Sequence, residues 1–117
     1  MPRILIVDDD PGIRATLLRV LRSFGYEVDD ATDGKAALDS VAAGKPDLIV
    51  LDWHMPAMDG IQTCRALRAS STIPVIMVSG NRWNSKGDAL NAGAIDYLPK
   101  PFSITDLLAR IEAALKP

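Results

Sequence analysis

The sequence predicts an α/β fold in which a doubly wound parallel sheet is covered by helices on both faces. Short apolar runs alternate along the chain with segments of helical periodicity, giving five β–α pairs. The runs ILIV and LIVL are too continuous for strands with one face in water, so both faces of these strands should be covered. The 117 residues suffice for one domain, and a hydrophobic content of 48% suffices for its core.

Five segments are predicted to be strands. The segments 3–7, 47–52 and 73–79 are nearly continuous apolar runs and should lie inside the sheet. The segment 26–31, with the sequence YEVDDA, is more polar and should lie nearer an edge. The segment 95–98, IDYL, is the last predicted strand.

Helical periodicity predicts five helices, at 12–25, 33–46, 59–70, 84–94 and 103–116. In the first of them the apolar stripe comprises Ile13, Leu17, Val20, Leu21 and Phe24. The helix over 84–94 should be short and weak, because Gly87 costs about 1 kcal/mol relative to alanine inside a helix.

Capping residues mark several of the helix ends. Asp10, Asp33 and Ser103 carry the side chains that accept hydrogen bonds from a first helical turn. Gly25 and Gly44 are expected to end the first and second helices.

The composition argues against several functional classes. The formal net charge is −2 and the basic residues are scattered singly, which argues against a nucleic-acid surface. The longest aliphatic runs fall far short of the roughly 20 residues that cross a membrane, and the N-terminus is not a signal peptide. Cys64 is the only cysteine, so it forms no internal disulfide. We expect a cytoplasmic protein, with residues 1–117 as a single domain and no output domain in this chain.

Polar side chains follow four of the predicted strands. They are Asp8, Asp9 and Asp10 after the first strand, Asp52 at the end of the third, Ser79 at the end of the fourth and Lys100 after the fifth. Ligands of doubly wound sheets bind at the carboxyl ends of the strands, so these side chains should meet at one edge.

The chemistry of this edge follows from its charge. Clustered carboxylates with one lysine favour a hard divalent cation, and magnesium prefers such oxygen ligands. A carboxylate can also accept a phosphoryl group as an aspartyl phosphate. Lys100 and Ser79 have the side chains to contact phosphate oxygens.

Four motifs together resemble the receiver domain of two-component response regulators, as in chemotaxis receivers. They are VDDD at 7–10, LDWHMPAMDG at 51–60, VSG at 78–80 and YLPKPF at 97–102. Each motif alone is weak, but all four occur in order, each at a strand end, and the resemblance covers essentially the whole chain. It implies a flavodoxin-like (βα)5 fold with the strand order 2-1-3-4-5.

The resemblance implies a phosphorylation switch rather than an enzyme acting on external substrates. Asp52 would accept a phosphoryl group from a histidine kinase or a histidine phosphotransfer protein, with Mg²⁺ as cofactor. The metal would be bound directly by Asp9, Asp52 and the backbone carbonyl of His54, and by Asp8 through water. The signal would pass to a downstream effector protein or to an output domain outside this chain.

The remaining site residues are also implied by the resemblance. Lys100 and Ser79 would contact the phosphoryl group, and Ser79 and Tyr97 would change position as the switch. The Lys100–Pro101 peptide bond is expected to be cis. In the family, the residues two positions beyond the acceptor and beyond Ser79, here His54 and Asn81, tune the lifetime of the phosphoryl group.

Simpler interpretations stand beside these. Asp10 would only cap the first helix, Ser79 could cap the fourth helix, and Tyr97 could be an ordinary half-buried strand residue. For the whole chain, the alternatives are a phosphorylation-independent interaction module and a small phosphatase-type hydrolase. The sequence departs from the family at Gly80, where alanine is usual, and the segment 79–93 is about one residue short, which leaves the output surface open.

The acid cluster generates a prediction about stability. A cation that binds only the folded site raises stability by mass action, so millimolar Mg²⁺ should raise the melting temperature of the protein. A thermal unfolding series in increasing MgCl₂ measures this. An unchanged melting temperature would count against a metal site.

Overall fold

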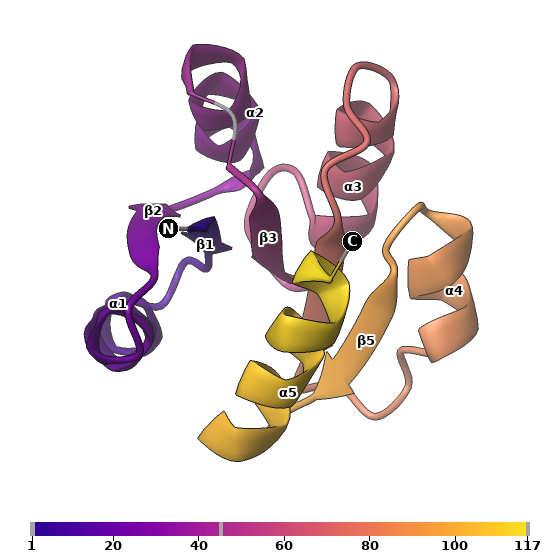
Figure 1. The fold of residues 1–117 in the computed structure, drawn as a ribbon. Coiled ribbons are helices and arrows are strands. Elements are labelled where there is room, and N and C mark those ends of the chain that lie inside the picture. Colours follow the sequence, from indigo (N-terminus) through magenta and orange to yellow (C-terminus); the bar gives the residue numbers. More distant parts are fainter. Residues whose placement is uncertain (1, 45, 117) are drawn as a thin grey trace.

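The structure, a computed structural model, describes residues 2–44 and 46–116. Five parallel strands form one sheet in the order β2-β1-β3-β4-β5, which confirms the predicted topology (Figure 1). The strands are β1 (Arg3–Val7), β2 (Glu27–Ala31), β3 (Leu48–Asp52), β4 (Val75–Ser79) and β5 (Asp96–Pro99). The polar strand β2 lies at one edge, as its sequence predicted.

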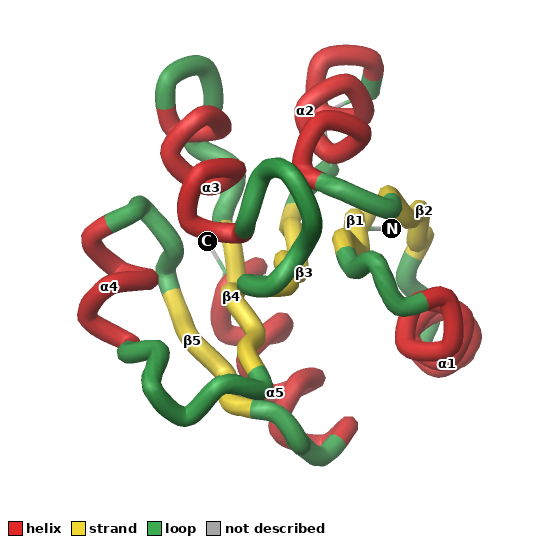
Figure 2. Tube along the Cα trace, turned by 180° about the vertical axis from the view of Figure 1, so that it is seen from behind, coloured by secondary structure: helices red, strands yellow, loops and turns green. Residues whose placement is uncertain are grey.

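Helices cover both faces of the sheet (Figures 1 and 2). They are α1 (Pro11–Ser23), α2 (Gly34–Ala43), α3 (Gly60–Arg68), α4 (Lys86–Asn91) and α5 (Ile104–Leu115). Buried residues of α1 and α5 pack on one face, and buried residues of α2, α3 and α4 pack on the other. This is the two-sided cover that the continuous apolar strands required.

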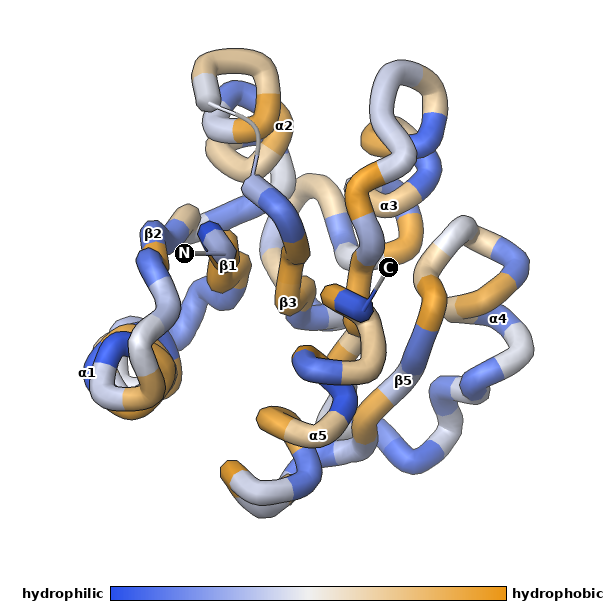
Figure 3. The backbone as a smooth tube through the Cα atoms, viewed as in Figure 1, coloured by the Kyte–Doolittle hydropathy of each residue, from blue (hydrophilic) through white to orange (hydrophobic). Residues whose placement is uncertain are grey.

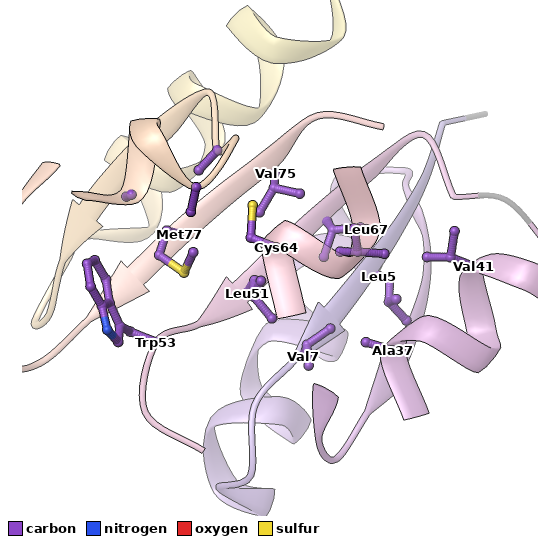
Figure 4. Close-up of a cluster of buried hydrophobic side chains, with 14 of the residues drawn as sticks. Leu5, Val7, Ala37, Val41, Leu51, Trp53, Cys64, Leu67, Val75 and Met77 are labelled. Atoms are coloured by element: carbon purple, nitrogen blue, oxygen red, sulfur yellow. The ribbon is translucent and has the colours of Figure 1, made fainter. Parts of the chain in front are cut away.

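Alternate residues of each strand serve the two halves of the core. In β3, Ile49 and Leu51 face the side of α2, α3 and α4, whereas Leu48 and Val50 face the side of α1 and α5. Figure 4 shows the first half, where Leu51 and Cys64 lie among neighbouring apolar side chains. Figure 3 shows β3 as hydrophobic along most of its length, while α5 alternates between hydrophobic and hydrophilic residues.

The predicted caps are present. The Asp10 carboxylate accepts a hydrogen bond from the backbone N–H of Gly12 at 2.8 Å, and Asp33 and Ser103 cap α2 and α5 in the same manner. Gly25 follows α1 with φ of 93°, a conformation that glycine adopts at little cost. These local signals explain why the helices begin and end close to the predicted positions.

Two details of the sequence interpretation were wrong. Phe24 was placed on the apolar stripe of the first helix, but it is 60% exposed because the helix ends at Ser23. The fourth helix spans only Lys86–Asn91, well inside the predicted 84–94. No helix in the described part of the chain is long and apolar enough to cross a membrane.

The connection between β3 and α3 is held tightly against the end of β3. The backbone N–H of Gly60 donates to the carbonyl of Trp53 at 2.8 Å, and Asp59 and Gln62 form a reciprocal capping box. A Cβ atom on Gly60 would lie 2.6 Å from the carbonyl oxygen of Asp52 and 2.7 Å from the Cα atom of Trp53. This glycine therefore lets the helix approach the strand end that carries Asp52.

We predict that Gly60→Ala lowers the free energy of unfolding by about 2 kcal/mol or more, because the added methyl group meets backbone atoms that cannot move independently. Urea unfolding measures the change. Gly87→Ala is the matched control: its Cβ would meet nothing closer than 3.8 Å, so the substitution should be neutral or stabilising by up to about 1 kcal/mol. Equal stability of Gly60→Ala and wild type would contradict the steric account.

Candidate functional site

The predicted polar residues meet at the carboxyl edge of the sheet. Asp8 follows β1, Asp52 ends β3, Ser79 ends β4 and Lys100 follows β5. These four strands are consecutive neighbours in the sheet, so their ends lie side by side. The backbone N–H of Lys100 also donates to the carbonyl of Ser79 at 2.7 Å, which fixes the segment after β5 against the end of β4.

Three of the carboxylates form a cluster. Asp8, Asp9 and Asp52 each place one oxygen within 4.8 Å of the others. Asp8 and Asp52 are 2% and 5% exposed, while Asp9 is exposed. Oxygen atoms gathered in this way, with one carboxylate open to solvent, fit a hard cation such as Mg²⁺ that keeps part of its water shell.

Lys100 lies between the two buried carboxylates. Its Nζ atom is 3.2 Å from Asp8 Oδ2 and 3.3 Å from Asp52 Oδ1. Burial lowers the pKa of Lys100, but the charges of Asp52 and Asp8 and the hydrogen bonds to both outweigh it, so the net pKa is raised. Lys100 is therefore firmly cationic. The peptide bond between Lys100 and Pro101 is cis, as predicted.

The single ammonium of Lys100 does not balance the negative charges of Asp8 and Asp52. Burial raises the pKa of Asp52, and the charge of Asp8 raises it further. The charge of Lys100, its hydrogen bond and a hydrogen bond from the backbone of His54 act in the opposite direction without cancelling the rise. An ionised Asp52 is thus costly to bury, and additional positive charge at the cluster would stabilise it.

Ser79 is buried and is held by the loop that follows it. Its Oγ atom accepts hydrogen bonds from Asn84 Nδ2 at 2.7 Å and from the backbone N–H of Asn81 at 3.1 Å. The interpretation of Ser79 as the cap of the fourth helix is wrong, because Ser85 caps α4 by accepting from the backbone N–H of Asp88 at 3.1 Å.

Tyr97 lies half-buried on β5. Its ring packs edge-on against Trp53, with ring centroids 5.9 Å apart and an interplanar angle of 86°. Its hydroxyl donates to the backbone carbonyl of Asn84 at 3.5 Å. Trp53 itself is buried at the end of the core beside Met77, as Figure 4 shows. A movement of Tyr97 would therefore change the surroundings of Trp53.

Sequence reasoning missed two residues that organise this edge. Arg14 on α1 donates to the backbone carbonyl of Asp8 at 2.7 Å and to the carboxylate of Asp30 at 3.1 Å, which ties the acid cluster to β2. Asn84 contacts both Ser79 and the ring of His54. Neither residue stands in a recognisable motif, and each has one partner far away in the sequence, 16 positions for Arg14 with Asp30 and 30 for Asn84 with His54.

An open groove lies beside the cluster, between α1 and the segment that links β5 to α5. It is lined largely by apolar side chains, including Ile13, Leu17 and Phe102, and Lys100 lies at its wall. Lys100, which contacts both Asp8 and Asp52, is the residue that the groove shares with the cluster.

Comparison with known proteins identifies the family. Residues 4–112 match the response regulator receiver domain. The chain belongs to this family. It is 47% identical over 116 residues to the response regulator MprA of Mycolicibacterium vanbaalenii, covering 97% of this chain and 50% of that protein. MprA of Mycobacterium avium is also 47% identical, with 97% and 51% covered. The chain thus spans about half the length of the curated relatives it matches.

Solved receiver structures agree with this membership. The receiver domain of Francisella response regulator 1452 has a TM-score of 0.91 at 36% identity, covering 98% of this chain and 97% of that one. Vibrio cholerae chemotaxis protein CheY4 has a TM-score of 0.91 at 33% identity, with 98% and 99% covered. The protein is thus a receiver domain of a two-component response regulator with a CheY-like, flavodoxin-like fold.

We predict that Asp52→Asn raises the free energy of unfolding at neutral pH without Mg²⁺, by the order of 1 kcal/mol, because it removes a buried charge. The raised pKa of Asp52 means that the native state binds its proton more tightly than the unfolded state. The contribution of Asp52 to wild-type stability therefore falls as pH rises from 3.8, the ordinary pKa of this group, through the raised value.

The gain in the free energy of unfolding from Asp52→Asn should consequently shrink as pH is lowered toward 3.8. Urea unfolding across pH 4 to 8 measures both effects. Asp39→Asn, which removes an exposed carboxylate of α2, is the control and should leave stability nearly unchanged. A variant no more stable than wild type at neutral pH would contradict the unbalanced charge of the site.

Proposed function

We propose that Asp52 is the phosphoacceptor of this receiver and that its phosphorylation switches the domain. The observation that carries the proposal is the position of this carboxylate. It is buried at the end of β3, with the Lys100 ammonium 3.3 Å away and oxygens of Asp8 and Asp9 within 4.8 Å. A nucleophilic carboxylate with a fixed cation beside it matches the requirements of phosphoryl transfer.

The donor is a histidine kinase or a histidine phosphotransfer protein, as the family membership supports. A carboxylate oxygen of Asp52 forms the new bond to phosphorus while the bond from phosphorus to the donor histidine nitrogen breaks, and the imidazole leaves with that electron pair. The chain's contribution is positional and electrostatic. Lys100 can follow the transferred charge, because its ammonium already contacts the carboxylate that becomes the acyl phosphate.

The metal-binding residues remain part of the proposal. Asp9, Asp52 and the backbone carbonyl of His54 would hold Mg²⁺ directly, and Asp8 would hold it through water. The clustered carboxylate oxygens support this assignment. When bound, the cation would neutralise negative charge on the phosphoryl oxygens.

We assign the donor's approach to the groove between α1 and the segment joining β5 to α5. Its apolar lining by Ile13, Leu17 and Phe102 suits the side of a helix, and Lys100 at its wall is the residue that contacts Asp52. A helical donor lying there would present its histidine to the cluster without entering the core.

The phosphoryl group adds charge and acceptor oxygens, which biases a two-state equilibrium. Ser79 and Tyr97 are the proposed moving parts, since both hydrogen bond to the loop between β4 and α4. The output passes to a downstream effector or to another domain of a longer protein in the cytoplasm. The domain is thus a signalling switch rather than an enzyme for external substrates.

We predict that incubation with acetyl phosphate and Mg²⁺ adds one phosphoryl group, seen by intact mass spectrometry, and that Asp52→Asn abolishes the adduct. Omission of Mg²⁺ should also abolish it, because the cation is needed at the carboxylate cluster. Asp39→Asn should label like wild type, since that exposed carboxylate lies on α2 away from the cluster.

Normal labelling of Asp52→Asn would overturn the assignment of the acceptor. A wild-type protein that is neither labelled nor altered by the phosphoryl mimic beryllofluoride would support the interaction-module alternative. Sustained turnover of an external phosphoester would instead support the hydrolase alternative.

A further inference from the structure

The side chain of Asn84 bridges two segments of the site. Its Nδ2 atom lies 2.7 Å from Ser79 Oγ and 2.7 Å from His54 Nε2. An amide nitrogen carries two hydrogens and only donates, so it can serve both acceptors at once. His54 lies in the loop after β3, and Ser79 ends β4. One side chain therefore joins the loop that follows Asp52 to the residue proposed to contact the phosphoryl group.

The backbone of Asn84 reaches the second switch residue. Its carbonyl accepts the hydrogen bond from the Tyr97 hydroxyl at 3.5 Å, a long contact that is easily broken. The ring of Tyr97 packs against the buried Trp53. Asn84 is thus bonded to both proposed switch residues, and its release would alter the surroundings of Trp53.

The contacts of Ser79 show why this bridge matters. Its Oγ atom accepts from Asn84 and from the backbone of Asn81, and both donors belong to the loop between β4 and α4. Within the described residues, the hydroxyl makes no hydrogen bond to Asp52 or Lys100. Its one hydrogen is donated to the backbone carbonyl of Asn81 at 3.5 Å. A Ser79 side chain that turns toward a phosphoryl group on Asp52 therefore gives up this contact together with the bond from Asn84.

We propose that Asn84 is a positioning residue that holds Ser79, His54 and Tyr97 in the resting arrangement and releases them when Asp52 is phosphorylated. This inference rests on the proposed function of Asp52. The hydrogen bond from Asn84 to Ser79 stabilises only the arrangement in which Ser79 faces the loop, so it opposes the switch by its own free energy. Removing it shifts the population toward the phosphoryl-binding arrangement.

Beryllofluoride affinity measures this shift without depending on phosphoryl lifetime. In a Trp83→Phe background, Trp53 becomes the sole tryptophan and reports on its contact with Tyr97. Trp83 is 81% exposed, so its replacement should be harmless. We expect Asn84→Ala to lower the midpoint of a beryllofluoride titration at constant Mg²⁺ by roughly three- to tenfold, the factor that one hydrogen bond supplies.

Two further variants distinguish the proposed role of the Asn84 side chain from general effects on folding. Asn84→Leu keeps a side chain of similar size without a donor and should give the same shift. Ser85→Ala removes the α4 cap from the same loop but makes no bond to Ser79, so it should leave the midpoint unchanged. A shift as large in Ser85→Ala as in Asn84→Ala would show that loosening the loop is sufficient, and would overturn the proposal.

The decisive control is the coupling with Ser79. In a Ser79→Ala background, Asn84→Ala should change the midpoint much less, because the bond to Ser79 is already absent and only the contact with His54 is left to remove. An undiminished shift in the Ser79→Ala background, or no shift from Asn84→Ala when Ser79 is present, would overturn the proposal that Asn84 holds Ser79. If the parent protein binds beryllofluoride normally, such a result refutes only the proposed role of Asn84. If the parent is neither bound by beryllofluoride nor labelled by acetyl phosphate, the proposed function fails with it.

Discussion

The burial of two carboxylates against a single ammonium is the interaction on which this site depends. Asp8 and Asp52 lie beside each other because β1 and β3 are adjacent in the sheet, and Lys100 contacts both from the segment after β5. Lys100 offsets part of their repulsion, and the raised pKa of Asp52 shows that an imbalance remains. The folded domain thus keeps unbalanced negative charge at the carboxyl edge of the sheet, and the proposed binding of a cation and of a phosphoryl group would use it.

Two arginines hold loops through backbone carbonyls, Arg14 at the edge of the sheet that carries the cluster and Arg68 at the opposite edge. Arg14 fixes the carbonyl of Asp8 and pairs with Asp30, so that α1, β2 and the first acidic loop move together. Arg68 donates to the carbonyls of Gly93, Ser71 and Ile73, which joins the end of α3 to the segments before β4 and β5. A guanidinium serves this purpose well because its fixed fork of donors reaches several acceptors at once.

The two loops beside Asp52 differ in what holds them. The loop from β3 to α3 is clamped by backbone contacts, since Gly60 packs directly on the strand end. The loop from β4 to α4 is held mainly by side-chain hydrogen bonds, and the helix that follows it spans only Lys86–Asn91. Backbone packing resists rearrangement, whereas a few polar contacts can be exchanged at low cost. Motion that follows a new charge on Asp52 is therefore expected on the β4 side.

The sequence by itself determined most of the elements and the edge of the sheet at which the polar side chains meet. Apolar runs located the strands, the capping residues Asp10, Asp33 and Ser103 located helix starts, and acids at strand ends marked where the site would form. These signals are local, because periodicity and capping act within a few residues. The strand order came from the resemblance to receivers and was confirmed by the structure.

Only the tertiary structure decided which side chains meet across that edge. The bridge from Asn84 to His54 joins residues 30 positions apart, and the contact of Lys100 with Asp8 spans 92 positions. No local pattern encodes such pairs, because they form only when the strands are adjacent and the loops pack against the strand ends. The error at Phe24 has a local cause, because its helical spacing continued past the point where the helix ends.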